Sequence, residues 1–171
     1  MNEVYLVRHG SVGNPQNVVY GRMPGFGLSE RGKKEAVQTA RFLAGRGIEV
    51  LYHSPLERCV RTASEITGVL GIPGMETPGI NEWDRDESLR DVQARMNDFW
   101  MSLYTQPYES IAAVSHRDPL RVLMLGLSGR SLSDVYKPEV FPLPPGGVWL
   151  LRPGRDGTVF ENIFSPGTDL T

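Results

Sequence analysis

Val4-Tyr5-Leu6-Val7-Arg8-His9-Gly10 is the stretch of this sequence that decides the fold. Its first four residues are apolar and rich in strand-forming types, which predicts a buried β-strand. Gly10 permits a sharp departure of the chain, so Arg8 and His9 should lie at the carboxyl edge of a sheet. Open α/β sheets place their ligands at this edge. A cation beside an imidazole there predicts an anion site with a nucleophile or base, although an isolated pair also fits a surface ion pair and a packed histidine.

The length of 171 residues suits one domain with one core, which we expect over residues 1–164, followed by a flexible tail over residues 165–171. A net charge of −2 argues against nucleic-acid and membrane partners. Cys59 is the only cysteine, which excludes an internal disulfide and fits a reducing compartment. The sequence shows neither a membrane-spanning apolar run nor a signal-peptide pattern, so we expect a cytoplasmic protein.

Strand and helix patterns alternate along most of the chain. Strands are expected at 4–7, 50–52, 75–80 and 110–115, helices opening near Ser29, Pro55, Ser88 and Pro119, and a closing hairpin at 148–151 and 159–163. This alternation predicts a three-layer α/β/α sandwich, and the hairpin makes its central sheet mixed and mostly parallel.

Three of these segments end on groups that bind anions. The first strand ends on Arg8 and His9, the second runs into a helix start that carries Arg58, and the strand at 110–115 ends on His116. Because parallel strands share a carboxyl edge, these groups should converge there. Two guanidinium groups and a helix N-terminus match the paired oxygens of a phosphoryl group, so we expect a phosphate-binding pocket.

The motif Leu6–Gly10 resembles the signature of the histidine phosphatase (phosphoglycerate mutase-like) superfamily. The resemblance continues in order through most of the chain, in the blocks Leu28–Gly32, Ser54–Ala63, Ile80–Asp84, Val114–His116 and Asp118–Arg121. The Arg-His-Gly motif alone is weakly specific, but this ordered series is highly specific. The last block has a form that is typical of short phosphatase-type members.

The resemblance implies a role for each of these polar groups. His9 would attack phosphorus and form a phosphohistidine. Arg8, Arg58 and His116 would together hold the phosphoryl oxygens and balance the charge that develops on them. Glu82 would protonate the leaving oxygen and then activate water, although Asp84 and other nearby acids are alternatives. Such a site needs no metal and no other cofactor.

The chain departs from the family pattern directly after the signature. Ser11 and Val12 stand where the family has an acidic or amide residue and then Thr or Ser, so the hydroxyl contact to phosphate moves to Ser11 or is lost. Asn14 is the candidate for the phosphate-binding asparagine of the family, but the loop also allows Asn17. Arg117 replaces a frequent glycine and either binds a second acidic group of the substrate or turns outward.

The segment after Glu82 lacks the insertion that caps the pocket in longer members. We therefore expect an open site, with Tyr20, Arg22 and Arg117 as contacts at its substrate rim. The short lid argues against a mutase, which must shield its phosphoenzyme from water.

The function predicted from the sequence is a histidine acid phosphatase-type phosphoric monoester hydrolase, metal-independent and acting on a small phosphorylated metabolite. Phosphate and sulfate should bind its site. Three alternatives remain: a protein-phosphohistidine phosphatase, a phosphoglycerate mutase-type phosphotransferase, and a non-catalytic phosphate-binding regulatory protein. The Pro-rich loop at 137–145 and the C-terminal hairpin are candidates for the edge of a homodimer.

Overall fold

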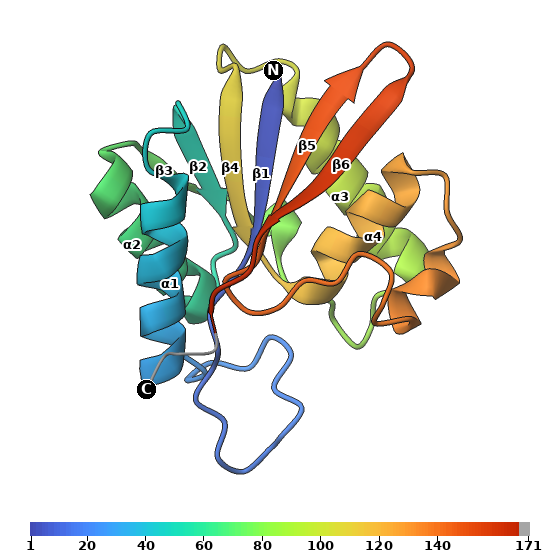
Figure 1. Ribbon diagram of the computed structural model, residues 1–171. Coiled ribbons are helices and arrows are strands. Elements are labelled where there is room, and N and C mark those ends of the chain that lie inside the picture. The colour runs from blue at the N-terminus through green and yellow to red at the C-terminus, as the bar shows by residue number, and fades with distance from the viewer. Residues whose placement is uncertain (168–171) are drawn as a thin grey trace.

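A six-stranded sheet in the order β3-β2-β4-β1-β5-β6 forms the centre of the computed structural model, which describes residues 1–167 (Figure 1). The first four of these strands are parallel to one another, and β5 runs antiparallel to both β1 and β6. The strands are β1 (Glu3–Arg8), β2 (Val50–His53), β3 (Gly74–Glu76), β4 (Ser110–Ser115), β5 (Val148–Gly154) and β6 (Gly157–Phe164). The expectation of an α/β sandwich with a mixed sheet is confirmed.

Two helices cover each face of the sheet (Figure 1). The helices are α1 (Glu30–Leu43), α2 (Glu57–Leu70), α3 (Leu89–Leu103) and α4 (Arg117–Leu127), with 3-10 turns η1 (Pro78–Ile80) and η2 (Leu132–Tyr136). Val4 and Leu6 of β1 pack into the core on the α3–α4 side, and Tyr5 and Val7 pack into the core on the α1–α2 side. This alternation follows from the period of two in a strand that is buried on both faces.

The helix boundaries follow the capping signals in the sequence. The Ser29 hydroxyl accepts a hydrogen bond from the Gly32 amide at the start of α1, and Ser88 forms a reciprocal capping box with Asp91 at the start of α3. Gly71 ends α2 in the left-handed conformation, with φ of 67°.

The strand expected at 75–80 is wrong over most of its length. Strand β3 ends at Glu76, and Pro78–Ile80 form a 3-10 turn instead. Pro78 has no amide hydrogen to donate to a neighbouring strand, whereas its fixed φ suits the first position of a helical turn. The helix expected from Pro119 also begins earlier, at Arg117.

A long loop between β1 and α1 lies beyond the carboxyl ends of β1 and β4 (Figure 1). Its two ends are held together by an antiparallel bridge between Val12 and Leu28. Within the described residues, no helix is long and apolar enough to cross a bilayer. Residues 165–167 have no regular secondary structure, and the rest of the expected tail lies outside the described residues.

Candidate active site

His9 lies directly after β1, at the carboxyl edge of the sheet, with only 3% of its surface exposed. Its Nδ1 is 2.8 Å from the carbonyl oxygen of Gly10. A carbonyl oxygen only accepts hydrogen bonds, so Nδ1 carries the proton and donates it. The tautomer is thereby fixed, and Nε2 keeps a free lone pair.

The surroundings of His9 keep its imidazole neutral. Burial lowers its pKa from the ordinary 6.5 to about 3, and the positive charges of Arg8 and Arg58 act in the same direction. Because a protonated imidazole has no lone pair at Nε2, this shift keeps the nitrogen nucleophilic at any physiological pH.

Arg58 lies in the first turn of α2 and is 1% exposed. Its Nε donates to Nδ1 of His116 over 3.3 Å, and its Nη2 donates to the carbonyl oxygen of Gly21 over 2.7 Å. Its Cζ lies 4.9 Å from the ring centre of Tyr20, which is a cation–π contact. The guanidinium is therefore held rigidly at the helix N-terminus, where anions are favoured.

His116 follows β4 and is fully buried beside His9, with 5.2 Å between the two ring centres. Its Nε2 lies 2.8 Å from the hydroxyl oxygen of Ser54, which itself donates to the side-chain oxygen of Asn81. Burial lowers the pKa of His116 well below its ordinary value, with contributions from His9 and Arg58. The two histidines thus form a neutral pair at the floor of the site.

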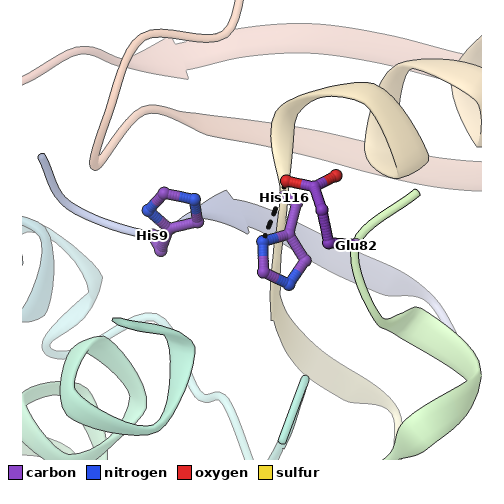
Figure 2. Close-up of side chains that lie close together, drawn as sticks. All are labelled: His9, Glu82 and His116. Atoms are coloured by element: carbon purple, nitrogen blue, oxygen red, sulfur yellow. Dashed lines mark ion pairs between the residues drawn. The ribbon is translucent and has the colours of Figure 1, made fainter. Parts of the chain in front are cut away.

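Glu82 points toward His116, as Figure 2 shows, with 3.4 Å between Oε2 and Nδ1. The same oxygen lies 3.6 Å from Nη2 of Arg58. Burial raises the pKa of the Glu82 carboxyl despite the nearby arginine. A carboxyl group that holds its proton more strongly than usual suits a general acid.

Arg8, His9 and Glu82 line a pocket of about 500 Å³, and Arg58 and His116 contact Glu82 without lining the pocket themselves. The guanidinium of Arg8 is held on one side, where Nη1 donates to the carbonyl oxygen of Leu143 over 2.9 Å. Its Nε is buried and makes no hydrogen bond within the described residues. The pocket and the residues directly behind it thus bring together a neutral imidazole, two fixed cations and a carboxyl group, which suits phosphoryl transfer.

The model of the histidine phosphatase superfamily (branch 1) matches residues 4–86 and 84–165 of this sequence. The chain belongs to the histidine phosphatase superfamily. An uncharacterized protein of Mycobacterium tuberculosis is 30% identical in an alignment 162 positions long, which covers 76% of this chain and 80% of that protein. The 2,3-bisphosphoglycerate-dependent phosphoglycerate mutase of Brucella ovis is 29% identical in an alignment 198 positions long, which covers 90% of this chain and 93% of the mutase.

Solved structures of histidine phosphatases share the fold. The phosphoserine phosphatase of Entamoeba histolytica, in complex with 3-phosphoglyceric acid, superposes with a TM-score of 0.83 at 20% identity, covering 100% of both chains. The alpha-ribazole phosphatase of Shigella flexneri gives a TM-score of 0.82 at 20% identity, covering 95% of this chain and 96% of that chain. The resemblance to a phosphoglycerate mutase-like fold that the motifs suggest is confirmed.

The structure brings Arg8, His9, Arg58, Glu82 and His116 together, whereas Ser11 and Asn14 form their hydrogen bonds outside this group. Ser11 donates through its amide and its hydroxyl to the carboxylate of Glu35 on α1. The Asn14 side chain donates to the Val18 carbonyl oxygen and accepts from the Val18 amide, which folds the loop on itself. Neither side chain lines the pocket. Asn17 lies in the left-handed region with φ of 55° and is also absent from the pocket wall.

The three residues expected at the substrate rim take different positions. Tyr20 lines the pocket, and Arg117 lines it while making a bidentate ion pair with Asp118. Arg22 lies in an adjoining cavity of about 360 Å³ and binds the turn that follows Glu82. Residues 83–87 form that turn without any inserted lid, and residues 18–21 of the long loop supply one wall of the pocket.

His9, Glu82 and His116 also form a set of donors whose ligand atoms lie within 4.8 Å of one another. Two imidazoles and a carboxylate are a donor set that suits a divalent cation such as Zn²⁺. Arg58 lies against both His116 and Glu82, and a fixed guanidinium repels a cation. The charge of this site therefore favours an anion over a metal.

Three buried polar residues near the site have no role that the sequence alone indicated. Ser54 holds His116, and Glu35 is 1% exposed and anchors the loop after His9. Arg121 is buried in α4, where it donates to carbonyl oxygens of residues 134–140. The one signal available is that Glu35 directly precedes Ala36, on the apolar stripe of α1.

Proposed function

We propose that this protein is a metal-independent phosphatase that hydrolyses phosphomonoesters through a phosphohistidine on His9. The observation that carries the proposal is the neutral, tautomer-fixed imidazole of His9 between two buried or anchored arginines. A pocket of about 500 Å³ supports a small phosphorylated metabolite as the substrate.

In the first step, Nε2 of His9 attacks phosphorus in line and forms an N–P bond as the ester P–O bond breaks. Arg8 and Arg58 hold the non-bridging oxygens of the transferred group, and the neutral His116 lies beside His9 and Arg58. The leaving alkoxide takes the proton of the Glu82 carboxyl, which burial keeps available. The product alcohol then departs.

In the second step, water attacks the phosphohistidine. Glu82 is now a carboxylate and accepts a proton from that water, while the N–P bond breaks and returns the electron pair to Nε2. Inorganic phosphate leaves, and Glu82 is again protonated. The pair of steps conserves all atoms and needs no metal or redox partner.

The experiment is hydrolysis of p-nitrophenyl phosphate with a chelator present, for the wild type and for His9→Asn. We expect chelator-insensitive turnover in the wild type and none in His9→Asn, with a radiolabelled phosphoenzyme that is labile to acid and stable to base. A chelator-sensitive rate would contradict the metal-free mechanism. Equal, negligible rates in both proteins would leave a non-catalytic phosphate-binding protein as the function.

A phosphoglycerate mutase is the second candidate, because the Brucella ovis relative bears that name and covers almost the whole chain. Against it, no lid follows Glu82 to keep water from the phosphoenzyme. Incubation with 3-phosphoglycerate and 2,3-bisphosphoglycerate separates the two. Release of inorganic phosphate supports the phosphatase, and conversion to 2-phosphoglycerate without that release supports the mutase.

A further inference from the structure

Within residues 1–167, the hydrogen bonds and ion pairs of the Arg22 side chain all go to the short turn that carries Glu82. Its Nε donates to the main-chain carbonyl oxygen of Glu82 over 2.7 Å. Its Nη2 donates to the Glu87 carboxylate over 2.9 Å, and its Nη1 lies 3.2 Å from the Asp84 carboxylate. Each nitrogen of the guanidinium therefore has a partner in this turn, which leaves Arg22 little capacity to bind a substrate.

Arg95 of α3 binds the same turn from a second element. Its Nη2 donates to the Glu82 carbonyl oxygen over 3.2 Å, and its Nη1 donates to the Asn81 carbonyl oxygen over 2.8 Å. The Glu87 carboxylate accepts from both arginines, with 2.7 Å to Nε of Arg95. The Glu82 carbonyl oxygen and the Glu87 carboxylate each accept from both arginines. This turn therefore links the long loop to α3.

The residues just before Arg22 contact the phosphate-binding side of the site. The Gly21 carbonyl oxygen accepts from Arg58, and the Tyr20 ring lies against the same guanidinium. Residues 20–22 therefore touch both Arg58 and the turn of Glu82. Arg58 and Glu82 also contact each other directly, with 3.6 Å between Nη2 and Oε2.

We propose that Arg22 is a positioning residue that fixes the backbone of Glu82 so that its carboxyl group faces the leaving oxygen. This inference rests on the proposed function, in which Glu82 is the general acid. The charges of Arg22 and Arg95 are balanced by Asp84 and Glu87, so Arg22 acts through geometry. A misplaced acid slows proton transfer steeply, because the reacting atoms must lie within hydrogen-bond reach.

The test compares two substrates that differ in their need for an acid. p-Nitrophenol leaves readily without protonation, whereas the alkoxide of glycerol 2-phosphate needs a proton. We expect Arg22→Gln to lower kcat by about tenfold or more on glycerol 2-phosphate and by much less on p-nitrophenyl phosphate. Arg22→Lys, which keeps one donor for the Glu82 carbonyl oxygen, should recover part of the rate. Arg90→Gln is the matched control, since Arg90 is exposed on α3 and makes no hydrogen bond to a described residue.

The double variant Arg22→Gln/Glu82→Gln decides whether Arg22 acts through the acid. If it does, the double variant should be no slower on glycerol 2-phosphate than Glu82→Gln alone. If the rate losses of the two single variants multiply in the double variant, or if Arg22→Gln slows both substrates equally, the role of Arg22 is overturned and the phosphatase function stays intact. If Glu82→Gln itself slows both substrates equally, the acid role in the proposed function fails, and the role of Arg22 fails with it.

Discussion

The neutral state of His9 predicts that the protein loses stability as the pH falls toward 5. His9 has a pKa of about 3 in the folded state and an ordinary value of 6.5, so the unfolded chain binds more protons between these values. Stability therefore rises with pH, and the contribution of His9 is complete above 6.5 and is lost as the pH falls. At about pH 5, protonation of His9 in the unfolded chain raises the unfolding equilibrium constant by a factor of about 30, which lowers the free energy of unfolding by ~2 kcal/mol.

Urea unfolding at about pH 8 and about pH 5 measures this contribution in the wild type and in His9→Asn. We expect the variant to lose ~2 kcal/mol less than the wild type between the two pH values, whatever its absolute stability. The comparison also removes the opposite effect of Glu82, whose raised pKa favours the folded state at low pH in both proteins. Because burial is the main cause of the His9 shift, high salt should leave the difference in place. An identical pH dependence in the two proteins would refute the buried neutral imidazole.

Four further substitutions test how the fold and the site are built. Gly32→Ala should cost about 2 kcal/mol or more in urea unfolding, because its Cβ would lie 1.9 Å from the Ser11 carbonyl oxygen. Gly68→Ala, at a helical glycine with open space around it, should instead raise the free energy of unfolding by about 0.5–1 kcal/mol. A lower value would contradict the steric explanation for Gly32. Arg58→Lys should lower kcat/KM by about 10²–10³-fold in steady-state kinetics, since an ammonium cannot replace the fork of contacts, and an unchanged value would refute this. Ser88→Ala should cost about 1 kcal/mol through the lost capping box without changing kcat, which unfolding and kinetic measurements check together.

Local patterns in the sequence determined most of the fold. The buried strand before His9 and the serine caps before α1 and α3 are visible because period and capping chemistry depend only on neighbours in the chain. The strand expected at 75–80 failed because Pro78 cannot donate to a neighbouring strand and its fixed φ suits the first position of a helical turn. The ordered motifs also led to the family, since they mark the strand ends that the parallel sheet gathers at one edge.

The tertiary structure alone decided what each polar group does once it reaches that edge. Ser11 and Asn14 follow His9 in sequence, yet the Ser11 side chain binds Glu35 and the Asn14 side chain binds the loop. Arg22 looked like a substrate contact but binds the turn of Glu82. A hydrogen bond depends on which groups face each other across the fold, and no local pattern records that. The sequence by itself therefore determined the family, the sheet and the place of His9 at its carboxyl edge, whereas the contacts that hold the turn of Glu82 followed only from the packing of a long loop against α3.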